Sequence, residues 1–265
     1  MSSAFRRLLV SAAAMATCLT GLVGPDAAHA RGPEYVALGD SYASGVGSRE
    51  YYDGSGVCQR SPHAYPVESA ARLGATLTFR ACAGAMVADV AVQLRALDAD
   101  TRYVSVQVGG NDAGFTRVIT ECAKPAWAQD CAGAVREARA FIKATLPNRL
   151  AGLYARIDNR SPSATVVVVG YPRLFHDEDC NAATWFSAAD RELLNDTADL
   201  LNSRVSAQAA AAGFAFADPT RAFLGHAVCD TPEWVNGLSS PVTESYHPNR
   251  AGQDGYAALV TPRLR

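Results

Sequence analysis

The sequence of 265 residues lacks several features that would place it in common functional classes. It has no run of basic residues, and its 24 lysines and arginines are nearly balanced by 26 aspartates and glutamates. Proteins that bind nucleic acid neutralise phosphates with clustered basic residues, so we expect no nucleic-acid partner. Repeats, low-complexity tracts and linkers are also absent from residues 31–265, which we interpret as one domain.

Closely spaced cysteine pairs are missing as well. A structural zinc site usually contains pairs such as C-x-x-C, and the seven cysteines include none. One of them, Cys18, lies in the amino-terminal segment, and an even number remains after it. In an exported protein, an even number of cysteines indicates disulfides. Six cysteines can pair in many ways, and their spacing leaves the choice open: Cys58, Cys82, Cys122, Cys131, Cys180 and Cys229.

The apolar run near the amino terminus is too short to span a membrane. Glycine, proline and aspartate interrupt it between residues 21 and 26, before it reaches the roughly 20 residues of a spanning helix. Two arginines precede the run, and a small-x-small sequence ends at Ala30. We therefore predict that residues 1–30 are a signal peptide, cleaved near Ala30, and that residues 31–265 are secreted. The arginine pair leaves both Sec and twin-arginine export open.

Apolar, β-branched runs alternate with helix-like stretches along the remaining chain. Strands are predicted at residues 34–40, 76–82, 102–110, 165–171 and 214–220. Helices are predicted at residues 64–74, 86–99, 131–159, 187–213 and 248–264. Several strands are apolar almost throughout, as in parallel strands that are covered on both faces. The alternation predicts an α/β fold, a three-layer α/β/α sandwich around a parallel sheet.

Polar or glycine-rich strings follow the first three predicted strands: GDSY, CAGA and GGND. Ligands of such sheets bind outside the carboxyl ends of the strands. We expect Ser41, Gly84 and Asn111 to meet at this edge, joined by His247 from the string ESYHPN. A serine nucleophile needs a base and donors for an oxyanion. His247 is the candidate base; the backbone N–H groups of Ser41 and Gly84 and the amide of Asn111 are the candidate oxyanion donors.

Each of these residues also has an ordinary structural interpretation. Gly84 alone suits a turn, Asn111 a turn or a helix N-cap, and His247 a helix cap. Their joint occurrence at one sheet edge favours catalysis. Asp40, adjacent to Ser41, is expected to accept hydrogen bonds from backbone N–H groups, not to act as a catalytic acid. The other histidines of the predicted mature chain have no neighbours that suggest a base: His63, His176 and His226.

In chain order, GDSY, the glycine of CAGA, GGND and HPN resemble the four sequence blocks of the SGNH (GDSL) hydrolases, close to secreted actinobacterial lipases, esterases and phospholipases. The resemblance extends from Glu34 to the last helix. It implies a flavodoxin-like, five-stranded parallel sheet and the roles given above for the four site residues. It implies no metal or organic cofactor. It also implies a disulfide pairing between neighbours in sequence: Cys58–Cys82, Cys122–Cys131 and Cys180–Cys229. The G-x-S-x-G elbow of ordinary α/β-hydrolases is absent around Ser41.

The group that orients the imidazole has two candidates. Many family members carry an aspartate three residues before the histidine, where this sequence has Glu244. Some related actinobacterial enzymes resemble a dyad, in which the carbonyl two residues before the histidine accepts the Nδ1–H; here that carbonyl belongs to Ser245. We favour the Ser245 carbonyl and keep Glu244 as the alternative.

The resemblance implies a secreted carboxylic ester hydrolase, a lipase or esterase that cleaves fatty-acid esters through a Ser41–His247 acyl-enzyme mechanism. A phospholipase acting on glycerophospholipids is the alternative, followed by a carbohydrate acetylesterase and a non-catalytic exported binding module. Expected partners are a small-molecule or lipid ester and, transiently, a lipid surface; the protein is expected to be a monomer. Apolar loop residues are expected to line an acyl groove or touch lipid, or else to form small hydrophobic clusters beside the main core: Trp127, Trp185, Phe186, Phe223 and Trp234.

Overall fold

A five-stranded parallel sheet forms the centre of the computed structural model, which describes residues 32–176 and 179–265. The predicted signal peptide, residues 1–30, lies outside the described residues. The strand order is β2-β1-β3-β4-β5, which is the order of flavodoxin-like folds and confirms the predicted fold class. The strands are β1 (Glu34–Gly39), β2 (Thr76–Phe79), β3 (Tyr103–Gln107), β4 (Thr165–Val169) and β5 (Ala215–Ala217).

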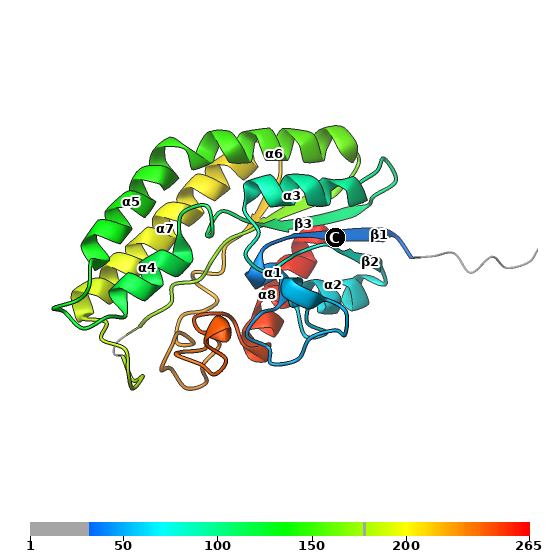
Figure 1. Ribbon diagram of the computed structural model, residues 1–265. Coiled ribbons are helices and arrows are strands. Elements are labelled where there is room, and N and C mark those ends of the chain that lie inside the picture. Colours follow the sequence, from blue (N-terminus) through cyan, green and yellow to red (C-terminus); the bar gives the residue numbers. More distant parts are fainter. Residues whose placement is uncertain (1–31, 177–178) are drawn as a thin grey trace, which may run out of the picture. The chain divides into compact units, whose positions relative to one another are not determined.

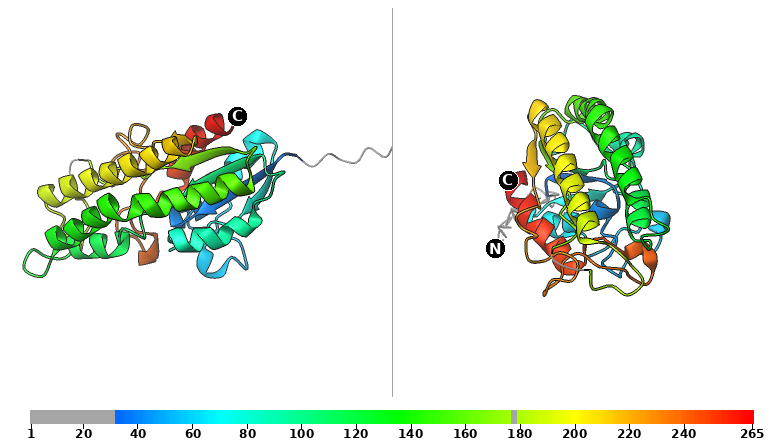
Figure 2. Two further views of the ribbon diagram at one scale, coloured as in Figure 1. Left: turned by 90° about the horizontal axis from the view of Figure 1, so that it is seen from above. Right: turned by 90° about the vertical axis from the view of Figure 1, so that its left-hand side faces the viewer.

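Helices cover both faces of the sheet (Figure 1). One face carries α2 (Tyr65–Leu73) and α8 (Arg250–Leu264). The other carries α3 (Val87–Gln93), α6 (Leu146–Arg160) and α7 (Ala188–Ala211). Beyond the carboxyl edge of the sheet, α4 (Phe115–Cys122) and α5 (Cys131–Ala144) lie beside the first half of α7 (Figures 1 and 2). The short helices are α1 (Ser41–Ser44) and the 3₁₀ turns at Gly56–Cys58, Leu94–Ala96 and Val242–Glu244. Within the described residues, no helix has the length and apolar character needed to cross a membrane.

One helix prediction was wrong, and one helix was not predicted. The stretch 131–159 is not one helix, because α5 ends at Ala144 and α6 begins at Leu146. Pro147 lies in the first turn of α6, where its missing N–H costs nothing, whereas inside a continuous helix it would remove a hydrogen bond. The helix α4 was not predicted, since its sequence FTRVITEC is rich in β-branched residues of modest helix propensity. Packing of its buried face therefore decides its structure.

The sheet core is apolar but contains several buried polar contacts. The second to fifth residues of β3 and β4 are all buried, so the strands run through the interior as predicted. Within this core the hydroxyl of Tyr35 lies 2.7 Å from Ser105 Oγ. Near the carboxyl edge, Gln107 Nε2 donates to the carbonyl of Gly170 at 2.7 Å. These hydrogen bonds satisfy groups that would otherwise destabilise the interior.

The three disulfides follow the pairing that the family resemblance implied. They join Cys58 to Cys82, Cys122 to Cys131 and Cys180 to Cys229, across 24, 9 and 49 positions of sequence. Each disulfide stabilises a protein mainly by restricting the unfolded chain, on the order of 2–4 kcal/mol. All three hold loops near the carboxyl edge: Cys82 follows β2, Cys122 and Cys131 bound the α4–α5 loop, and Cys180–Cys229 joins two long connections.

The strand order also locates the candidate site. Between β1 and β3 the direction of strand succession reverses, because the chain moves from β1 to β2 on one side and then returns to β3 on the other. At such a switch point the connections leave in opposite directions and open a crevice at the carboxyl ends of the strands. The segments that follow β1 and β3 contain Ser41 and Asn111.

Candidate functional site

Ser41 is held at a sharp transition from strand to helix. It is the first residue of α1, which starts directly after β1 and the N-cap Asp40. Gly39, at the end of β1, has φ +143°, and a Cβ there would lie 2.5 Å from the carbonyl oxygen of Gln107. Only glycine therefore fits at this position. The carboxylate of Asp40 accepts the N–H of Tyr42 at 3.0 Å, as predicted.

His247 meets Ser41 from the far end of the chain. Its Nε2 lies 2.8 Å from Ser41 Oγ, and its Nδ1 lies 2.9 Å from the carbonyl oxygen of Ser245. A carbonyl only accepts hydrogen bonds, so Nδ1 carries the proton and the lone pair of Nε2 faces the serine hydroxyl. Of the two candidates for orienting the ring, the Ser245 carbonyl contacts it. The carboxylate of Glu244 instead accepts a hydrogen bond from Tyr51 at 2.6 Å.

The residue between Ser245 and His247 has a strained backbone. Tyr246 has φ +59°, in the left-handed region, which costs a non-glycine residue on the order of 1–3 kcal/mol. This turn directs the Ser245 carbonyl back at the imidazole. Two hydrogen bonds hold it: Tyr42 Oη donates to the Tyr246 carbonyl at 2.7 Å, and Tyr246 N–H donates to the Asn236 carbonyl at 2.9 Å.

Three hydrogen-bond donors face the cleft that contains Ser41. Gly84 has φ +78°, which favours glycine, and open space lies where a Cβ would stand. Its N–H, like that of Ser41, donates to no acceptor within the described residues. The amide of Asn111 donates one hydrogen to the Ala85 carbonyl at 3.1 Å, so its second hydrogen remains available. Ser41, Gly84 and Asn111 all line this cleft.

Two residues that support this arrangement were not singled out from the sequence. Tyr171 Oη donates to Asp40 at 2.5 Å and accepts the Gly110 N–H at 3.3 Å, so one hydroxyl joins the segments that follow β1 and β3. The buried carboxylate of Asp112 accepts the Val87 N–H at 2.8 Å. Both residues lie at the carboxyl ends of predicted strands, and this position was the available signal.

Burial changes the acid–base properties of the site. Loss of solvent around His247 lowers the pKa of its imidazole to about 4, and the hydrogen bond to Ser245 opposes that change. Burial also raises the pKa of the Asp40 carboxyl to about 7, against the hydrogen bond from Tyr171. His247 is therefore neutral near pH 7, which is the protonation state that a base requires.

Two cavities open onto Ser41. An outer cleft of about 610 Å³ contains the three donors and is bordered by surface loops. An inner pocket of about 80 Å³ runs from Ser41 between α4, α5 and α7. Its walls are almost entirely apolar, and these aliphatic residues are among those that line it: Val118, Ala138, Ile142, Leu194 and Ala198. Phe115 and Ile119, one helical turn apart on α4, border both cavities.

The apolar loop residues named from the sequence divide into two groups. Trp127 and Trp185 are 88% and 52% exposed, and Trp185 lines the outer cleft. Phe186 and Phe223 are buried, and Trp234 packs edge-on against Phe223 with 5.2 Å between the ring centres. The first group suits contact with a substrate or an apolar surface, whereas the second group is core.

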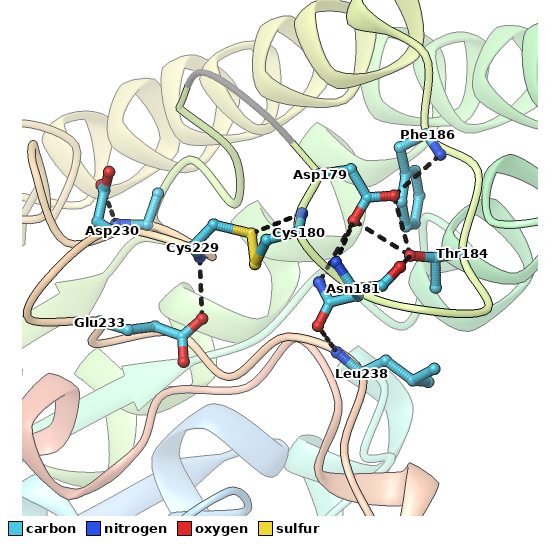
Figure 3. Close-up of a disulfide and its surroundings, with 10 residues drawn as sticks. Asp179, Cys180, Asn181, Thr184, Phe186, Cys229, Asp230, Glu233 and Leu238 are labelled. Atoms are coloured by element: carbon cyan, nitrogen blue, oxygen red, sulfur yellow. Dashed lines mark hydrogen bonds between the residues drawn. A yellow bond between two sulfur atoms is a disulfide. The ribbon is translucent and has the colours of Figure 1, made fainter.

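A disulfide-linked loop forms one border of the outer cleft, and Figure 3 shows the disulfide and the hydrogen bonds of this loop. The carboxylate of Asp179 accepts hydrogen bonds from Asn181, Thr184 and Phe186 and so fixes the turn that carries Trp185. Cys180–Cys229 connects this turn to the chain after α7. Asn181 Oδ1 also accepts the N–H of Leu238, another cleft residue. Because the described part of this loop contains no helix or strand, side-chain hydrogen bonds and the disulfide hold it in place.

The remaining histidines of the predicted mature chain lie in other contacts. His63 Nε2 is 2.8 Å from Glu50, and His226 stacks on Trp234 with 4.0 Å between the rings. His176 Nδ1 is 3.2 Å from Asp230. In the part of the chain that the structure describes, no group of three or more His, Cys, Asp or Glu side chains is arranged to hold a metal ion.

A serine and a histidine in contact at the switch point of a parallel α/β sheet, beside N–H groups without acceptors in the described residues, have the arrangement that serine hydrolases use. The chain belongs to the GDSL-like Lipase/Acylhydrolase family, whose sequence pattern matches residues 37–254.

Similarity to enzymes from Streptomyces agrees with this family assignment. A lipase of Streptomyces rimosus is 40% identical over 262 residues, covering 96% of this chain and 97% of the relative. The crystal structure of an extracellular lipase from Streptomyces rimosus has a TM-score of 0.80, with 40% identity over 88% of this chain and 98% of the other. That of phospholipase A1 from Streptomyces albidoflavus NA297 has a TM-score of 0.81, with 42% identity and the same coverage.

The low pKa of His247 predicts that kcat/KM is maintained at acidic pH. A neutral imidazole is needed to accept the serine proton, so kcat/KM should fall only as the pH drops through about 4. The measurement is kcat/KM for a soluble ester between about pH 3 and pH 9. Asp40→Asn is the control, because the Asp40 carboxyl has its pKa near 7. An acid limb near the ordinary histidine value of about 6.5, unchanged in Asp40→Asn, would contradict the prediction.

Proposed function

We propose that the protein is a secreted carboxylic ester hydrolase, a lipase or esterase that cleaves fatty-acid esters through an acyl-enzyme on Ser41. One observation carries the proposal: Ser41 Oγ lies 2.8 Å from His247 Nε2 at the junction of an apolar pocket and a donor-lined cleft. Membership of the GDSL-like Lipase/Acylhydrolase family and the similarity to the Streptomyces rimosus lipase support the same reaction class.

The proposed mechanism assigns one proton transfer to each half-reaction. His247 Nε2 takes the Ser41 proton as Oγ attacks the ester carbonyl, and the Ser245 carbonyl holds the imidazolium through Nδ1–H. The oxyanion accepts hydrogen bonds from the N–H groups of Ser41 and Gly84 and from the amide of Asn111. The imidazolium then protonates the leaving alcohol. In the second half-reaction, water attacks the acyl-enzyme with His247 again as base. No step needs a metal or an organic cofactor.

The inner pocket supports an apolar acyl group. It begins at Ser41 and continues between helices, where its apolar walls would favour a hydrocarbon chain by about 0.8 kcal/mol per buried CH₂. The outer cleft is larger and contains the donors, so the leaving alcohol has room on that side. This arrangement favours fatty-acid esters over the acetyl esters of carbohydrates.

A lipid surface is the proposed source of substrate. Exposed apolar side chains border or adjoin the outer cleft, including Trp185, Leu238 and Val242. Long-chain esters aggregate in water, so an apolar border beside the cleft would hold the enzyme transiently at such an aggregate. A phospholipase A activity is the second candidate. It is favoured by the similarity to the Streptomyces albidoflavus phospholipase A1 and by the presence of two cavities at Ser41.

Hydrolysis of p-nitrophenyl esters tests the proposed reaction. The mature protein should hydrolyse medium-chain esters, and Ser41→Ala should retain at most a trace. Asn111→Ala should lower kcat by about 10²–10³, the loss for one oxyanion donor. No Ser41-dependent hydrolysis at any chain length would instead favour a binding module. Phosphatidylcholine, assayed in parallel, distinguishes a phospholipase, and a maximum at acetate would favour an acetylesterase.

Filling the inner pocket tests where the acyl chain binds. Ala198 on α7 lines this pocket, so Ala198→Leu should lower kcat/KM for p-nitrophenyl octanoate by about tenfold while the value for acetate changes little. Ala210→Leu is the matched control, because Ala210 lies on the same helix and is exposed. Equal octanoate activity in the two variants would place the acyl chain elsewhere.

Export is tested on the protein recovered from the medium of an expressing actinobacterium. The relative from Streptomyces rimosus is extracellular, and the amino-terminal segment has the composition of a signal peptide. Amino-terminal sequencing should therefore give a chain that begins at Arg31, and light scattering should give the mass of a monomer. A cell-bound chain that retains residues 1–30, or a stable dimer, would contradict this part of the proposal.

A further inference from the structure

Glu244 lies three residues before His247 but does not contact the imidazole. Its side chain is 3% exposed. One carboxylate oxygen accepts a hydrogen bond from Tyr51 Oη at 2.6 Å, and the other lies 3.7 Å from Arg49 Nε. A buried carboxylate is costly unless it is paired, and here Oε1 accepts the hydrogen bond from Tyr51 whereas Oε2 has no hydrogen-bond partner within the described residues. The position at which other family members orient the imidazole directly is here used for a different contact.

Tyr51 connects this carboxylate to the segment after α1. Its hydroxyl accepts the N–H of Gly47 at 3.2 Å while it donates to Glu244. Burial and the neighbouring carboxylate raise the pKa of Tyr51 to about 12, so the hydroxyl keeps its proton. Gly47 packs directly against the base, since a Cβ on it would lie 3.0 Å from His247 Cβ. The loop after the nucleophile and the loop of the base are thus joined beside the imidazole.

We propose that Glu244 is a positioning residue: through its hydrogen bond from Tyr51 it fixes the Ser245 carbonyl that orients His247. This inference deepens the proposed function, because it depends on His247 acting as the base. The contact between Tyr51 and Glu244 is called the loop clamp below.

The strained backbone at Tyr246 explains why the loop clamp is needed on the amino side of Ser245. Tyr246 holds its left-handed conformation only while both flanking segments are fixed. On the carboxyl side, Tyr42 Oη fixes the Tyr246 carbonyl, and on the amino side the Tyr246 N–H, which shares its peptide group with the Ser245 carbonyl, donates to Asn236. Glu244 is the residue just before Ser245, and its side chain adds a further anchor on this amino side.

Because the group that orients His247 is a neutral carbonyl, its position matters more than its charge. An aspartate would stabilise the imidazolium by its charge over a range of distances, whereas a neutral carbonyl acts through one directed hydrogen bond. That bond, 2.9 Å from Ser245 O to His247 Nδ1, depends on where the backbone holds the carbonyl. A small displacement of residue 245 therefore changes the ring orientation and the distance from Nε2 to Ser41.

The loop clamp is tested with Tyr51→Phe, Glu244→Ala and Glu244→Gln. The first two remove the hydrogen bond, and the third keeps an acceptor for the Tyr51 hydroxyl. Tyr35→Phe is the matched control: it removes a buried tyrosine hydroxyl at the start of β1, at the opposite end of the strand from Ser41. For each variant we would measure kcat, KM and Tm, and the rate at which an organophosphonate labels Ser41.

We expect Tyr51→Phe and Glu244→Ala to lower kcat and the labelling rate by about tenfold or more, with KM nearly unchanged. Glu244→Gln should recover most of both rates, and Tyr35→Phe should keep them even where its Tm falls as far as that of Tyr51→Phe. Wild-type rates in Glu244→Ala, or equal losses in Tyr51→Phe and Tyr35→Phe, would overturn the proposal. So would a Glu244→Gln variant as slow as Glu244→Ala. Labelling needs no carboxylic ester, so wild-type labelling without hydrolysis would count against the proposed function while the clamp was still tested.

Discussion

The hydrogen bond between Ser41 Oγ and His247 Nε2 joins residues 206 positions apart, and the rest of the site depends on it. Such a bond weakens steeply with distance and angle, so the two loops must be held to within a few tenths of an ångström. Several contacts join α1 to the carboxyl-terminal region. Tyr42 Oη donates to the Tyr246 carbonyl at 2.7 Å, and Gln253 on α8 donates to the Tyr42 carbonyl at 3.0 Å. The nucleophile and the base are thus fixed by the same short helix.

Within the described part of the chain no carboxylate makes a hydrogen bond to the His247 ring, and this has an energetic consequence. Burial without a neighbouring negative charge lowers the imidazole pKa to about 4, so the histidine is a weak base in the resting enzyme. In the proposed mechanism, the imidazolium forms next to the developing oxyanion, and the two opposite charges stabilise each other in a site of low dielectric constant. The pair therefore gains most in the transition state, where the gain increases the rate. Because of this low pKa, the neutral form of His247 also persists to acidic pH.

The sequence was sufficient for the sheet and for the residues at its edge. The strands were predictable because parallel strands are apolar along their length, and the rule that ligands bind outside the carboxyl ends of such strands then placed Ser41 and Asn111 at one edge. The orienting carbonyl of Ser245 was left as one of two candidates, because the choice depends on the left-handed turn at Tyr246, which no side-chain pattern predicts. The contact of Tyr51 with Glu244 joins positions 193 residues apart. Such contacts follow from loop packing and have no periodic signal in the sequence.

One helix joins the chemistry of the site to its selectivity. Phe115 packs edge-on against the His247 ring at 6.0 Å and, with Ile119, forms the wall shared by the inner pocket and the outer cleft. The same apolar wall therefore removes water from the base and offers a surface to an acyl chain. A chain bound along α4 would exclude further water and strengthen the hydrogen bonds to the oxyanion. On this argument, acyl binding and catalysis cannot be optimised separately, because a substitution at Phe115 changes the solvation of His247 and the shape of the acyl site together.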